Sequence, residues 1–131
     1  DMSKVTAQIG QKHYITTIRS SGNEIVADEP RAEGGEDAGF APDELLAASL
    51  AACTSITLRM YADRKAWPME SVEVEVNFER DSVAKTSTIV RRIKFFGTLD
   101  DEQKHRLLQI ADKCPVHLVL THPITIQTAL A

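Results

Sequence analysis

The chain has 131 residues, which is enough for one domain with a sizeable core. Nineteen acidic and fifteen basic side chains give a net charge of −4, which argues against a nucleic-acid partner, since phosphates require clustered Lys and Arg. No apolar segment follows a basic start, so no signal peptide is expected. The uncharged stretch at 45–58 is shorter than the roughly 20 residues that span a membrane. Two cysteines 61 positions apart do not make a disulfide scaffold, so we expect a cytoplasmic protein with free or redox-active thiols and no membrane partner.

The first forty residues predict strands followed by a loop. Residues 5–18 predict two short strands on either side of Gly10, and residues 24–27 predict a third. Residues 29–40 are rich in glycine and acidic side chains, which is typical of a loop.

A long helix is expected next. Proline is tolerated in the first helical turn, and Asp43 and Glu44 suit the positive end of the helix dipole, so the helix should begin at Ala41 or Pro42. The helical pattern continues to about Ala66. Such a helix would be about 37 Å long, close to the diameter of about 36 Å expected for a compact domain of this size.

A hairpin should follow the helix. Residues 72–78 alternate strictly between apolar and polar side chains and are the clearest strand in the chain, and residues 88–98 predict a second strand. The basic residues of the second strand could face Glu73, Glu75 and Glu79 across the hairpin.

The C-terminal part predicts a helix, a helical turn and a strand. Asp100 and Gln103 have the spacing of a capping box for a helix over 101–113. Residues 115–121 predict another helical turn or two, and residues 124–130 predict a final strand.

This order of elements indicates an α+β fold, with a mostly antiparallel sheet packed on the long helix in a single domain over 1–131. Over 45–58 the helix has no polar face, and such a helix is buried all round. A second copy of the chain could cover the part that the sheet leaves open, which would give a homodimer with the helix near the interface. A monomer whose own sheet and C-terminal elements wrap the helix is an equal alternative.

Cys53 lies near the middle of this apolar helix, and Cys114 lies in the sequence ADKCPVH at 111–117. Burial disfavours the thiolate, so both cysteines could be small hydrophobic residues. Alternatively, one is a peroxidatic thiol and the other a resolving thiol, which requires a nearby cation to hold the thiolate. His117 forms a Cys-x-x-His spacing with Cys114, but a zinc site needs further ligands, and we expect no metal.

Candidate cations lie upstream of the helix. Arg19 follows the second strand and Arg31 lies in the acidic loop, where an arginine is more often a solvated charge. Asp43 and Glu44 could orient an arginine, in addition to compensating the helix dipole.

Residues 42–54, PDELLAASLAACT, resemble the central-helix signature of the OsmC/Ohr family, the osmotically induced and organic hydroperoxide resistance proteins. Residues 111–117 resemble the second-cysteine motif of that family, and with the strand order the resemblance covers nearly the whole chain. It implies an OsmC-like fold and an obligate, intertwined homodimer with active sites at the interface. It also implies a thiol-dependent peroxidase for organic hydroperoxides that uses no cofactor and is reduced by an external dithiol.

By position, Cys53 resembles the peroxidatic cysteine and Cys114 the resolving one. The resemblance therefore implies a sulfenic acid at Cys53, followed by a disulfide between Cys53 and Cys114. The alternative function is a non-enzymatic dimeric binding protein for a small apolar ligand, in which both cysteines are structural.

The arginine that holds the thiolate in the family lies in the loop before the central helix, and the local sequence favours Arg31. In the Ohr branch the arginine lies earlier, nearer Arg19. Its acidic partner is usually a glutamate ten residues before the cysteine. Here that position is Asp43, whose side chain is shorter, and Glu44 is next to it.

Overall fold

A computed structural model describes residues 2–131 of the chain. The chain divides into two compact units, the first ending at Leu46 and the second comprising residues 47–131. Helix α1 (Pro42–Arg64) begins in the first unit and continues through the second. The single domain expected over 1–131 stays a prediction.

The first unit contains a three-stranded antiparallel sheet. Strands β1 (Thr6–Ile9), β2 (Thr16–Arg19) and β3 (Glu24–Ala27) lie side by side in chain order. All three lie where the sequence pattern predicted them. The loop after β3 contains a short 3-10 turn, η1 (Arg31–Glu33), which holds one of the predicted site residues.

Helix α1 begins at Pro42, as predicted, and ends at Arg64. Ala66 has a left-handed φ of 55°, which an α-helix cannot continue, so the helix is slightly shorter than expected. Its buried side chains follow one stripe: Leu50, Thr54, Leu58, Tyr61 and Ala62. By length and composition alone α1 could cross a membrane, a property that it shares with the core helices of soluble proteins.

Strands β4 (Met69–Asp81) and β5 (Thr86–Gly97) form the predicted antiparallel hairpin. Two of the predicted acid–base pairs lie directly opposite each other: Glu73 with Lys94 and Glu75 with Arg92. The third was wrong, because Glu79 lies opposite Thr88. The side chains of both strands alternate between a covered and an exposed face, as a half-buried hairpin requires.

Two short helices follow the hairpin. Helix α2 (Asp101–Ala111) starts with the predicted capping box, in which the Asp100 carboxylate accepts the backbone N–H of Gln103, and the Gln103 side chain accepts that of Asp100. Helix α3 (Pro115–Leu120) confirms the predicted helical turn.

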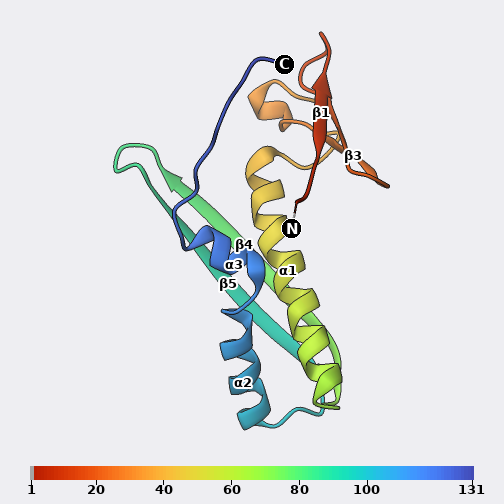
Figure 1. Cartoon of the computed structure of the whole chain (residues 1–131), viewed down its shortest axis with the longest axis vertical. Coiled ribbons are helices and arrows are strands. Elements are labelled where there is room, and N and C mark those ends of the chain that lie inside the picture. Colours follow the sequence, from red (N-terminus) through yellow and green to blue (C-terminus); the bar gives the residue numbers. More distant parts are fainter. Residues whose placement is uncertain (1) are drawn as a thin grey trace. The chain divides into compact units, whose positions relative to one another are not determined.

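The core of the second unit lies between α1, α2 and one face of the hairpin (Figure 1). It is formed by buried residues from all three elements and their connections: Leu58, Tyr61, Ala62, Met69, Leu99, Leu107, Ile110 and Ala111. Three residues of the hairpin pack against it: Val72, Ile93 and Phe95. This packing fixes the position of α1 relative to β5 and to the connection between α2 and α3.

The prediction of a final strand at 124–130 was wrong for this chain. These residues form no strand and no ladder with the strands of the described residues. A strand requires a neighbour for its backbone N–H and C=O groups, and sequence alternation alone cannot supply one. Ile124 and Ile126 remain exposed as a result.

The fold class is α+β with antiparallel sheets and one long helix, as predicted. The strands belong to two separate sheets, β1-β2-β3 and β4-β5, and not to one.

Candidate functional site

Cys114 lies between α2 and α3, and its side chain is fully buried. Its sulfur accepts the backbone N–H of His117 at 3.4 Å, so Cys114 is the N-cap of α3. Pro115 occupies the first helical position, where an N–H would have no intrahelical partner. The Cys-x-x-His spacing is therefore that of a helix cap. Within residues 2–131, no group of three or more His, Cys, Asp or Glu side chains could hold a metal ion.

Thr54 of α1 also contacts the Cys114 side chain. Its hydroxyl oxygen lies 3.8 Å from Cys114 Sγ, and it donates a hydrogen bond to the backbone oxygen of Leu50 at 2.7 Å. The Thr54 side chain is also fully buried. The residue that directly follows Cys53 thus touches the second cysteine.

Arg91 of β5 joins Thr54 and Cys114 in one cluster of polar contacts. It was not among the site residues predicted from the sequence. Its side chain is only 12% exposed, and Nη1 donates to Thr54 Oγ1 at 3.1 Å. A signal was present in the sequence, because a period of two places Arg91 on the face of β5 that carries the covered apolar residues Ile89, Ile93 and Phe95. Arg92 lies on the other face, opposite Glu75.

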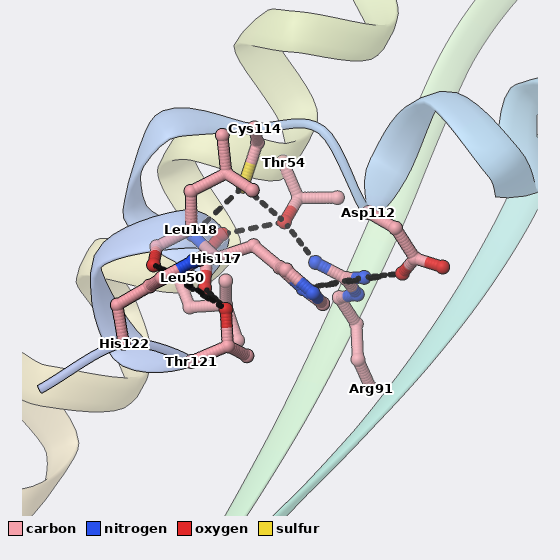
Figure 2. Close-up of polar contacts among 9 residues, drawn as sticks. All are labelled: Leu50, Thr54, Arg91, Asp112, Cys114, His117, Leu118, Thr121 and His122. Carbon is pink, nitrogen blue, oxygen red and sulfur yellow. Dashed lines mark hydrogen bonds and ion pairs between the residues drawn. The ribbon is translucent and has the colours of Figure 1, made fainter.

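Asp112 and His117 bind the outer edge of the Arg91 guanidinium (Figure 2). Arg91 Nη2 lies 2.7 Å from Asp112 Oδ1 and 3.3 Å from His117 Nδ1. Since arginine can only donate, His117 Nδ1 accepts this bond when the ring carries its proton on Nε2. The carboxylate of Asp112 is 66% exposed, so a largely buried cation is neutralised by an anion at the surface.

A cavity of about 290 Å³ adjoins this cluster. Arg91 and His117 supply its charged and polar wall. Its other lining residues are mostly apolar or hydroxylated: Leu50, Ser87, Ile89, Leu120 and Thr121. A small ligand with an apolar body and a polar end would fit such a lining.

Cys53 is half-buried on α1, and both cysteines are free. It precedes Thr54, so its backbone lies one residue from the contact with Cys114. The disulfide between Cys53 and Cys114 and the roles of the two thiols stay predictions.

The loop that carries Arg31 is organised by Asp28, which the sequence analysis did not identify. This buried carboxylate accepts backbone N–H groups at 2.7–3.1 Å from four residues: Tyr14, Glu29, Glu36 and Ala38. Burial raises the pKa of Asp28, but the four hydrogen bonds together outweigh this effect and hold the pKa below its ordinary value. The loop around Arg31 therefore has a fixed anionic centre.

The remaining predicted residues lie in the first unit. Arg31 begins η1, is exposed, and its guanidinium makes no hydrogen bond or ion pair within residues 2–131. Glu44 accepts the backbone N–H of Ala41 at 2.9 Å and so caps the start of α1, while Asp43 lies in the same first turn. Arg19 is paired with Glu24 at 2.8 Å. A contact of Arg31 with Asp43 or Glu44 stays a prediction.

A protein-family model for OsmC-like proteins matches residues 34–129. The chain belongs to the OsmC family. The matched region contains Cys53, Cys114 and the whole Arg91 cluster, whereas Arg31 lies just before it. No curated protein sequence matches the chain.

Solved structures share the OsmC fold with this chain. An OsmC-like protein from Mycoplasma pneumoniae is 20% identical, with a TM-score of 0.80 over 92% of this chain and 87% of that one. The organic hydroperoxide resistance protein OhrB of Bacillus subtilis is 24% identical, with a TM-score of 0.63 and coverage of 92% and 91%. An organic hydroperoxide resistance protein from Elizabethkingia anophelis is 19% identical, with a TM-score of 0.69 and coverage of 92% and 89%.

Proposed function

We propose that this OsmC-family chain is a thiol-dependent peroxidase that reduces organic hydroperoxides, of the alkyl or fatty-acid type, to alcohols. The Cys53 thiolate attacks the distal oxygen of the hydroperoxide, the O–O bond breaks, and the alcohol leaves after taking up a proton. Cys53 becomes a sulfenic acid. The Cys114 thiol then displaces water from it and forms a disulfide, which an external dithiol reduces by thiol–disulfide exchange. The proposal requires no bound cofactor and places the reaction in the cytoplasm.

One observation carries the proposal: the residue after Cys53 contacts Cys114, within a region that matches the OsmC family. Sixty residues separate Thr54 from Cys114 in the sequence, so only the fold brings these two segments together. Solved structures named as organic hydroperoxide resistance proteins share this fold, which supports the same class of substrate here.

The cation that we propose for the Cys53 thiolate is Arg31. Arg19, the alternative, is engaged by Glu24, whereas the Arg31 guanidinium makes no hydrogen bond or ion pair within residues 2–131. The Asp28 carboxylate fixes the loop around Arg31, which lowers the entropic cost of holding an arginine in a defined place. Asp43 or Glu44 would orient it.

We further propose a homodimer with the active sites at its interface. Large apolar side chains are exposed on α1, α3 and the C-terminal segment of the single chain: Ile56, Met60, Leu118, Val119, Ile124, Ile126 and Leu130. Large exposed apolar side chains mark surfaces that a partner covers in many proteins, which supports a second copy as the cover.

The test is turnover of cumene hydroperoxide in the presence of a dithiol. The wild type should consume the peroxide and Cys53→Ser should not. Equal rates for the two proteins, or no turnover by the wild type, would reject the proposal. Intact mass after one equivalent of peroxide adds a second criterion, because the wild type should lose two hydrogens. A binding protein with structural cysteines would keep its mass unchanged.

A further inference from the structure

Arg91 occupies an unusual place for a charged residue. It lies on the covered face of β5 and is 12% exposed, whereas Arg92 and Lys94 lie on the open face opposite glutamates. Burying a guanidinium is costly unless its hydrogen bonds are made. Its bonds to Asp112 and His117 hold the outer edge, and its bond to Thr54 directs the inner edge toward Cys114.

The Thr54 hydroxyl has one proton and three polar neighbours. Arg91 Nη1, at 3.1 Å, can only donate, so Thr54 Oγ1 accepts that bond. The single hydroxyl proton then has two possible acceptors, the Leu50 oxygen at 2.7 Å and Cys114 Sγ at 3.8 Å. With Cys114 as a neutral thiol, the proton belongs on the closer Leu50 oxygen.

The acceptor changes when Cys114 loses its proton. The sulfur then carries a negative charge and already accepts the backbone N–H of His117. A charged acceptor binds a donor more strongly than a neutral one, which favours rotation of the Thr54 hydroxyl toward the sulfur. The Leu50 oxygen is not orphaned by this rotation, because within a helix it also accepts the backbone N–H four residues later.

We propose that Arg91 and Thr54 are positioning residues for Cys114. Arg91 fixes and polarises the Thr54 hydroxyl, and Thr54 donates to the Cys114 sulfur while that sulfur attacks the Cys53 sulfenic acid. In this step the Cys114 thiolate attacks the Cys53 sulfur, the S–S bond forms and the S–O bond of Cys53 breaks, and the departing hydroxide takes up the proton that Cys114 released, giving water. The inference rests on the proposed function and concerns its second chemical step only.

The experiment separates the two steps by intact mass. Fully reduced protein receives one equivalent of cumene hydroperoxide, and quenched samples are followed for the gain of one oxygen and for the loss of two hydrogens. In Thr54→Val, which keeps the side-chain shape, the oxygen adduct should form at the wild-type rate. The disulfide should then form roughly tenfold more slowly or worse, as expected when a hydrogen bond to a charged group is lost.

Three further variants make the result specific. Thr54→Ser keeps the hydroxyl and should restore the rate of disulfide formation. Arg91→Gln should slow the same step. Thr57→Val removes a half-buried hydroxyl from the same helix outside the cluster and should behave as the wild type. Circular dichroism of each variant checks that the fold is retained.

The outcomes distinguish this inference from the proposed function. If Thr54→Val and Arg91→Gln close the disulfide at the wild-type rate, the positioning role is wrong and the peroxidase proposal stands. If Thr54→Ser forms the disulfide as slowly as Thr54→Val, the Thr54 hydroxyl does not assist Cys114 and the inference is overturned. If the wild type forms no oxygen adduct and no disulfide, the proposed function fails and this inference falls with it.

Discussion

Arg91 and Thr54 are 37 positions apart in the sequence, yet Arg91 Nη1 donates a hydrogen bond to Thr54 Oγ1 at 3.1 Å. This bond joins strand β5 to helix α1 on the side of the helix that faces Cys114. It is the structural link between a buried cation and a buried thiol.

This bond should be measurable as a coupling in stability. Arg91→Gln, Thr54→Val and the double variant should show a coupling free energy of about 1 kcal/mol in urea unfolding, because the donor and acceptor are both largely buried. The same cycle with Thr57→Val should be additive. Additivity in the Thr54 cycle would mean that the bond contributes nothing in solution.

Arg31 and Arg19 should differ in their effect on turnover. Arg31→Gln should lower the rate with cumene hydroperoxide by roughly a hundredfold, the usual cost of removing one charge-stabilising donor from an active site. Arg19→Gln removes the same charge from the first unit and should change the rate little, because Arg19 pairs with Glu24. A large loss of turnover in Arg19→Gln and a small one in Arg31→Gln would show that Arg19 stabilises the Cys53 thiolate.

Asp28 should make the stability of the protein sensitive to acid. Its pKa is lower in the folded than in the unfolded chain, so its contribution is present above the unfolded value of about 3.9 and is lost as the pH falls through the folded pKa. Asp28→Asn should therefore be less stable than the wild type at pH 7, and the difference should shrink at low pH. Urea unfolding at several pH values measures this.

The matched control for Asp28 is Asp37→Asn. Asp37 lies in the same loop, is exposed and has a positive φ of 55°, which asparagine accepts. Its substitution removes one charge without removing the acceptor of four N–H groups. An equal pH dependence in the two variants would show that net charge, and not the Asp28 bonds, sets the acid sensitivity.

Gly35 is held too tightly in the Arg31 loop to accept a larger residue. A Cβ at this position would overlap the backbone oxygen of Glu29 and approach the Asp28 carboxylate. Gly35→Ala should therefore lower the free energy of unfolding by about 1–3 kcal/mol, the usual cost of overpacking. Gly22→Ala is the control, since a Cβ there meets no atom within 4 Å. Equal stability of the two variants would contradict the tight loop.

The proposed homodimer should depend on the exposed side of α1. Ile56 is 55% exposed in the single chain, and Ile56→Lys should lower the mass measured by light scattering at low micromolar concentration. Val83→Lys changes a 92% exposed apolar residue of the hairpin turn and should leave the mass unchanged. A wild-type protein of monomeric mass would reject the dimer directly.

Local patterns predicted the elements of this fold well. The start of α1 follows from Pro42 and the acidic first turn, the hairpin from its strict alternation, and α2 from the Asp100 capping box. Each signal lies within a few residues of the element that it specifies. The strand predicted at 124–130 failed because its pairing partner is not a local property.

The candidate site was predicted only in part for the same reason. The two cysteines stand out by their residue type, and the segments around them resemble motifs of the OsmC/Ohr family. Thr54 and Arg91 gain their significance from contacts across 60 and 37 positions, which depend on how α1 packs on β5. Asp28 was not predicted because its carboxylate accepts backbone N–H groups, which every residue type except proline can donate.

The sulfur of Cys114 is also part of the backbone architecture, since it accepts the His117 N–H that begins α3. The proposed disulfide would give this sulfur a second covalent partner and change its position relative to the His117 N–H, so oxidation would alter the hydrogen bond that begins the first turn of α3. Fraying of helix α3 would then depend on the redox state of the Cys114 sulfur. The amide exchange rate of His117 would give a label-free gauge of how far the protein has been oxidised.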